Sequence, residues 1–157
     1  MKLIKQSDKQ GVFQISKREK RLLFDILKLY PLTPAVHHRL SRTADANAIE
    51  ADQRLLEQAL AEQKKENRKQ LMALLTEENR FVEARDGYRF TLDTHQTDWL
   101  LQILNDIRVG SWLKLGCPDE KQGKPAELND DNFYYYFAME YCLLFQAALL
   151  TAFDRPK

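Results

Sequence analysis

The sequence contains few of the residue types from which recognisable active sites are built. Its 157 residues include two cysteines, three histidines and five glycines. Two cysteines exclude a scaffold held by disulfides and are typical of a reducing compartment. The scattered glycines form no phosphate-binding loop, and no Ser/His/Asp arrangement can be recognised. We therefore expect no catalytic residues, no cofactor and no enzyme activity.

A targeting segment is also lacking. No apolar run of about 7 to 15 residues follows the basic start, so we expect no secretion signal and a cytoplasmic protein. The length fits one domain over residues 1–157. A hydrophobic content of 44% and a charged content of 30% are ordinary for a soluble globular chain.

The hydrophobic pattern predicts a mainly α (α+β) fold, compact, with about four helices and two small β-hairpins. One hairpin is expected from residues 3–4 and 12–15 around a loop containing Gly11. The other joins residues 81–82 to the alternating residues 88–92, with Asp86-Gly87 as its two-residue turn.

Capping patterns and helix-stopping residues set the predicted helix bounds. Ser16 with Glu19, and Asp93 with Gln96, have the spacing of capping boxes. We expect helices from Ser16 to Pro31, over 49–79, from Asp93 to Leu115, and over 131–153. The polar stretch 63–70 within the second helix is expected to be solvated. Residues 31–48 and 117–130 are expected to be flexible or irregular.

The last predicted helix is apolar almost all round, with 18 hydrophobic residues among the 23 of positions 131–153. Such a helix is a core helix, a dimer seam or a membrane span. Glu140 within it argues against a span, because a carboxylate near mid-bilayer costs about 2.5 kcal/mol or more. We favour a buried core helix.

The helix preceding it has two apolar faces. Trp99, Ile103 and Ile107 mark the face expected in the core. The opposite face suggests either packing between the first and last helices or a contact patch for a protein partner, since Trp and Arg are enriched at interface hot spots. The candidate partner-binding residues are Asn105, Arg108, Val109 and Trp112.

Positive charge is concentrated at the start of the chain, where residues 1–42 have a net charge of +7. Basic clusters can bind phosphates, but no nucleic-acid-binding motif accompanies this one and the whole chain has a net charge of only +1. A solvated or internally paired face is the favoured interpretation. The residues of the nucleic-acid alternative are Lys17, Arg18, Lys20, Arg21, Arg39 and Arg42.

The histidines and cysteines have no metal-binding spacing. His37-His38 and His95 lie apart from any cysteine pair. Cys117 and Cys142 are too far apart for a redox or zinc motif and are expected to be inert thiols. We therefore expect no metal site.

Residues 104–108 (LNDIR) followed by 113–116 (LKLG) resemble the signature of a bacterial domain-of-unknown-function family, the one numbered twenty-seventeen. The resemblance extends over the C-terminal half and implies a small, mostly helical cytoplasmic protein without established catalytic residues. Some members are encoded beside an adaptor of the Clp protease, which implies a role in proteolysis or stress regulation. In physical terms, we expect Asn105 and Asp106 to hydrogen-bond a neighbouring loop or strand end and Arg108 to pair with an acid.

The sequence thus favours a non-enzymatic regulatory or adaptor module that acts through protein contacts, and a homodimer. The alternative is a nucleic-acid-associated protein that uses the basic N-terminal segment.

Overall fold

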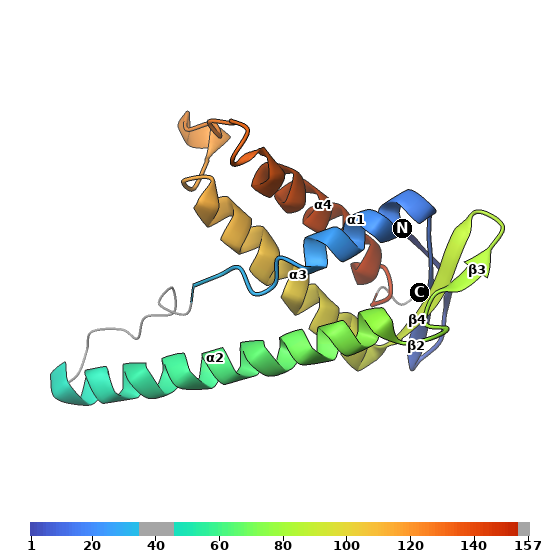
Figure 1. The fold of residues 1–157 in the computed structure, drawn as a ribbon, viewed down its shortest axis with the longest axis horizontal. Coiled ribbons are helices and arrows are strands. Elements are labelled where there is room, and N and C mark those ends of the chain that lie inside the picture. Colours follow the sequence, from blue (N-terminus) through green and yellow to red (C-terminus); the bar gives the residue numbers. More distant parts are fainter. Residues whose placement is uncertain (35–45, 154–157) are drawn as a thin grey trace.

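The computed structural model describes residues 1–34 and 46–153. Three helices, α1 (Lys17–Leu27), α3 (Thr94–Lys114) and α4 (Phe133–Leu150), lie on one face of a four-stranded sheet. A fourth helix, α2 (Ala46–Thr76), runs along the side of this body and extends past it (Figure 1). The predicted mainly helical α+β class is confirmed for the described residues.

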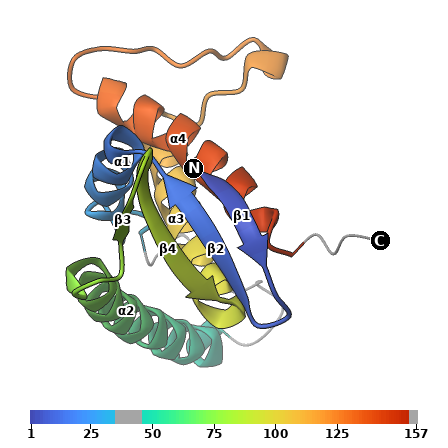
Figure 2. The ribbon, with the colours of Figure 1, turned by 90° about the vertical axis from the view of Figure 1, so that its right-hand side faces the viewer.

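The strands form one antiparallel sheet, whereas the sequence predicted two separate hairpins. The strands are β1 (Lys2–Gln6), β2 (Gln10–Ile15), β3 (Val82–Ala84) and β4 (Gly87–Asp93), in the order β1-β2-β4-β3 (Figure 2). β2 pairs with β4 from Gln10 opposite Asp93 to Ile15 opposite Tyr88. A two-stranded hairpin by itself would leave its apolar face partly exposed. When the two hairpins join, their apolar faces form one surface, and the helices cover it.

The second hairpin turns one residue earlier than predicted. Ala84 pairs with Gly87, so the two turn residues are Arg85 and Asp86. Gly87 instead begins β4 with φ of +132°, and a Cβ there would lie 2.2 Å from the carbonyl oxygen of Ile15. Glycine is therefore required because β2 passes so close to this backbone.

Both predicted capping boxes are confirmed. Ser16 Oγ accepts from the Glu19 N–H at 3.2 Å, and the Glu19 carboxylate accepts from the Ser16 N–H at 2.9 Å. Asp93 and Gln96 form the same reciprocal pair at the start of α3. These pairs satisfy backbone donors that a helix start leaves free, which explains why the predicted starts are accurate.

The helix ends differ from the predictions by a few residues. α1 ends at Leu27, because the next residues tighten into three-residue turns before Pro31. α2 covers 46–76 and not 49–79, and Asn79 has left-handed φ of 65°. α4 covers 133–150 and not 131–153, since Asn129 and Asn132 hydrogen-bond the local backbone in a turn ahead of the helix. Side-chain bonds of this kind compete with helical hydrogen bonding.

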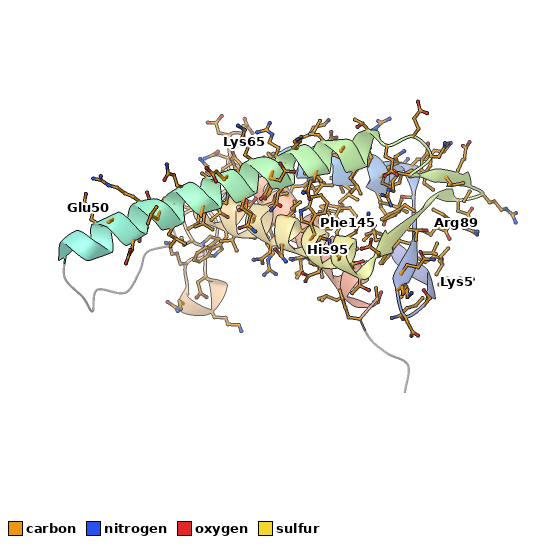
Figure 3. The ribbon with its side chains drawn as sticks, turned by 90° about the horizontal axis from the view of Figure 1, so that it is seen from below. Lys5, Glu50, Lys65, Arg89, His95 and Phe145 are labelled. Atoms are coloured by element: carbon orange, nitrogen blue, oxygen red, sulfur yellow. The ribbon has the colours of Figure 1, made fainter. Side chains whose placement is uncertain are left out.

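The core lies between the sheet and the three helices. Phe13 and Phe90, on neighbouring strands, stack with ring centroids 5.6 Å apart. Phe145 of α4 lies in the interior next to α3 (Figure 3). The most deeply buried helical residues include Ile26, Leu27, Ile103, Leu104, Ile107, Cys142 and Leu149.

Residues 63–70 of α2 are exposed as expected, except for Lys64 and Asn67, which contact the body together with the buried Leu71. Lys64 Nζ lies 3.0 Å from Asp106 Oδ2. Asn67 accepts from Trp99 Nε1 and donates to the Tyr30 hydroxyl, both at 3.2 Å. The N-terminal half of α2 projects into solvent, with Glu50 near its far end (Figure 3) and Leu55 64% exposed. At 1.5 Å per residue, the 31-residue helix is about 46 Å long.

Residues 117–130 are irregular, as predicted, apart from a short 3-10 helix, η2 (Glu120–Gln122), and a bridge between Asp119 and Lys124. Of the segment 31–48, residues 35–45 lie outside the described part, and residues 46–48 belong to α2.

Within 1–34 and 46–153, no helix combines the length and the apolar character that crossing a bilayer requires.

Candidate protein interface

α4 is buried on one side only, so the expectation of a buried core helix holds for that side alone. Ala138, Cys142, Phe145 and Leu149 recur every three to four residues and face the core. No described element covers the opposite side, because the sheet and the other helices all lie on the core side. The exposed fractions there are 55% for Phe133, 50% for Leu143, 60% for Leu144 and 52% for Leu150.

Two adjoining hollows lie between α3 and α4, on the surface that we call the α3/α4 face. The larger, of about 500 Å³, is lined by residues that include Leu101, Arg108 and Leu150. The smaller has a volume of about 330 Å³. Arg108 and Leu143 line both hollows. The residues lining the smaller hollow are Arg108, Val109, Trp112, Met139, Glu140 and Leu143.

The four predicted partner-binding residues all lie on this face. Asn105 and Arg108 line the larger hollow, and Arg108, Val109 and Trp112 line the smaller one. Trp112 is 37% exposed, and its Nε1–H donates to the Pro118 carbonyl at 3.0 Å. That hydrogen bond fixes the indole edge while leaving part of the ring available for contact.

Arg108 has no acidic partner among the described residues, which contradicts the predicted ion pair. Its Nη2 donates to Asn105 Oδ1 at 3.2 Å, one turn away on the same helix. Glu140, on the opposite wall of the smaller hollow, forms no ion pair or hydrogen bond within the described residues either. The hollow therefore holds one positive and one negative side chain, both unpaired, among apolar ones.

Asp106 forms the expected bond to a neighbouring loop, whereas Asn105 bonds only Arg108 of its own helix among the described residues. Its carboxylate accepts from the backbone N–H of Leu32 at 2.7 Å and of Thr33 at 3.1 Å, and Thr33 Oγ1 donates to its carbonyl at 2.9 Å. Lys64 adds the ion pair from α2. The two residues of the Asn-Asp motif therefore have different roles. Asp106 hydrogen-bonds the 31–33 turn, and Asn105 hydrogen-bonds the Arg108 side chain.

The described basic residues of the nucleic-acid alternative all lie on α1, and two of them have neighbours on the β3–β4 side of the molecule. Lys20 Nζ lies 3.9 Å from the Tyr88 ring centroid and 4.6 Å from that of Phe81, an internal cation–π arrangement. Lys17 lies 3.5 Å from Glu83. Arg18 and Arg21 are exposed. Arg39 and Arg42 lie outside the described residues.

The thiols and histidines are dispersed. Cys142 is buried in the core, and this burial raises the pKa of its thiol to about 12, although Arg108 lowers it in part. Cys117 is half-buried at the end of α3. His95 is exposed on the first turn of α3, while His37 and His38 lie outside the described residues. In the described segments, no three His, Cys, Asp or Glu side chains are grouped to hold a metal ion.

Glu140, Leu143 and Leu150 were missed by the sequence interpretation. α4 carries apolar residues in every direction, so periodicity does not distinguish its outer side from its core side. The one available signal was Glu140 itself, because a lone carboxylate in an apolar helix marks the side that reaches water.

No family model, no curated protein and no solved structure matches the chain. Membership of the domain-of-unknown-function family therefore stays a prediction from residues 104–116. Any functional conclusion rests on the physical properties of the α3/α4 face.

Proposed function

We propose that this protein is a non-enzymatic regulatory or adaptor module that works by binding protein through its α3/α4 face. The observation that carries the proposal is the exposure of Leu143 and Leu150, which line hollows that Arg108 lines as well. Soluble chains rarely leave a contiguous apolar patch of this kind uncovered, and such patches mark interaction sites.

The residue composition of the face supports a protein partner. Trp and Arg supply most of the binding energy at protein interfaces, and Trp112 and Arg108 lie beside each other around the smaller hollow. The other residues lining this hollow are Val109, Met139, Glu140 and Leu143, of which only Glu140 is charged. This pattern of an apolar centre with a sparse polar component matches the core of a protein–protein contact.

The shape of the face favours a protein over a small ligand. Small molecules bind in cavities that enclose most of their surface. Here exposed apolar residues also lie on α4 outside the hollows, at Phe133 (55% exposed) and Leu144 (60% exposed). An extended surface on two rigid helices suits another folded element.

The matched variants Leu143→Arg and Leu55→Arg test this function. Both introduce a charge at an exposed helical leucine, at 50% and 64% exposure, but only Leu143 lies on the α3/α4 face. In a nuclease-treated native lysate, we expect Leu143→Arg to abolish specific capture of protein, including of differently tagged copies of the chain. Leu55→Arg should leave capture intact.

Two results would count against the proposal. Equal capture by both variants would place the binding surface elsewhere. Capture that disappears on nuclease treatment alone would favour the nucleic-acid alternative and the exposed residues Arg18 and Arg21.

A further inference from the structure

We infer that the α3/α4 face binds the same face of a second copy of this chain, and that Arg108 of each copy pairs with Glu140 of the other. The inference rests on the proposed function, because it names the partner of the same surface. It is carried by the unpaired opposite charges of this face, by the apolar residues between them and by the extent of the face.

The charges are arranged for self-recognition. Arg108 on α3 and Glu140 on α4 line the same hollow from its two walls, and neither has a counter-charge within the described residues. In a two-fold contact, every pairing of one residue with another occurs twice, once in each direction. A face that carries one residue of each sign across its midline therefore gains two attractive pairs with its own copy.

The apolar residues between these charges suit the centre of such a contact. Leu143 lies in both hollows, with Met139 and Val109 beside it in the smaller one. Packing two such faces forms a four-helix arrangement in which the exposed sides of both α4 helices become core. The all-round apolar character of α4 is then explained, because its inner side packs in one copy and its outer side between copies.

The available area is sufficient. α4 has 18 residues and is about 27 Å long, and α3 and α4 together are about 20 Å wide. The face therefore offers on the order of 500 Å² per copy, or about 1,000 Å² in total, which is about the minimum for a biological interface and typical of weak association.

Two charge-reversal variants, Arg108→Glu and Glu140→Arg, test the pairing. Sedimentation velocity and light scattering at about 5 to 100 μM measure the oligomeric state of each. The wild-type chain should be dimeric. Each reversal places like charges opposite each other twice and should weaken self-association by at least roughly tenfold. An equimolar mixture of the two variants should form a heterodimer, because both cross-pairs then join opposite charges. The double reversal should also restore the dimer.

Arg68→Glu and Glu62→Arg on α2 are the matched controls. Both residues are exposed and lie away from the α3/α4 face, so their reversal should leave the dimer unchanged. Circular dichroism checks that each variant is folded. If Arg108→Glu fails to fold, the exposed Glu140→Arg decides alone.

The outcomes separate this inference from the proposed function. A wild-type chain that stays monomeric up to 100 μM overturns self-pairing, as does a dimer insensitive to Glu140→Arg. In either case, protein capture that Leu143→Arg still abolishes would leave the proposed function standing with a different partner. A Leu143→Arg variant that changes neither capture nor oligomeric state would overturn both.

Discussion

Lys64 of α2 and Asp106 of α3 form an ion pair in which Nζ and Oδ2 are 3.0 Å apart, and both side chains are about 85% buried. The same carboxylate holds the N–H groups of Leu32 and Thr33. One side chain thus joins the turn after α1, the polar middle of α2 and the helix that carries the candidate interface.

Asp106→Ala should therefore destabilise the fold by roughly 2–4 kcal/mol, because it leaves two backbone donors and a largely buried ammonium without their partner. Lys64→Met should cost less, since Asp106 would keep its backbone bonds. Urea unfolding measures both. The control is Lys28→Ala, which removes the exposed pair with Asp25 and should leave the stability nearly unchanged, because solvent screens such a pair. Equal losses for Asp106→Ala and Lys28→Ala would contradict the anchoring role.

Lys20 should stabilise the contact between α1 and the β3–β4 hairpin through its aromatic neighbours. Its Nζ lies over Tyr88, Phe81 and Phe24, at 3.9, 4.6 and 5.5 Å from the ring centroids. Lys20→Gln is expected to cost about 1 kcal/mol, and Lys20→Arg should retain most of the interaction. The exposed neighbour Arg21→Gln serves as the control in the same thermal unfolding experiment. If Lys20→Gln and Arg21→Gln have equal effects, the ring contacts contribute nothing.

The two thiols should differ in reactivity. Burial raises the pKa of Cys142 from 9.0 to about 12, with Arg108 opposing it in part, so its thiolate is scarce at pH 8. A disulfide reagent should titrate one thiol per native chain, Cys117, and two in urea. A Cys117→Ser variant that still reacts rapidly when native would contradict the burial of Cys142.

The raised pKa of Cys142 also predicts the sign of an alkaline effect. Above about pH 9 the unfolded thiol loses its proton while the folded thiol keeps it, so the free energy of unfolding falls as the pH rises. Cys142→Ala should show a shallower decrease between pH 9 and 10.5 than the parent chain. Parallel pH curves for the two proteins would show that this thiol is not linked to folding.

The features predicted well from the sequence are local ones. The capping pairs Ser16–Glu19 and Asp93–Gln96 and the helix stop at Gly116 depend on residues within one or two turns of each other. The helix face with Arg108 and Trp112 was found for the same reason, because the pitch of a single helix determines which residues share a side.

The features missed depend on contacts between distant segments. No local signal indicates that β2 pairs with β4, some eighty residues away, or that Lys64 in a polar stretch is docked against Asp106. Likewise, the apolar periodicity of α4 does not distinguish Leu143, which is exposed, from Leu149, which is buried. Which strands pair and which side of a helix is buried depend on packing between elements. The periodicity of a single sequence carries no information about that packing.

Gly110→Ala should have two effects of opposite sign on the free energy of unfolding. Replacing a glycine within a helix by alanine ordinarily stabilises the helix by about 1 kcal/mol. Here the added Cβ would lie 2.7 Å from Leu32 Cβ and 2.8 Å from the Leu32 backbone carbon, so the turn held by Asp106 would have to move. Because the closest neighbours include backbone, the clash should win, and Gly110→Ala should destabilise the fold by about 1–3 kcal/mol.

Gly116→Ala is the matched comparison for Gly110→Ala, because it separates backbone strain from steric clash. Gly116 has φ of +77° and open space around its Cβ position. Alanine there is strained without clashing and should cost about 1 kcal/mol, whereas Gly116→Asn should recover part of that loss because asparagine tolerates the left-handed region. The Gly110 site should behave differently, with asparagine worse than alanine because it is larger. A Gly110→Ala variant that raises the unfolding midpoint would show that the turn at Leu32 yields without cost, and that Asp106 does not hold it rigidly against α3.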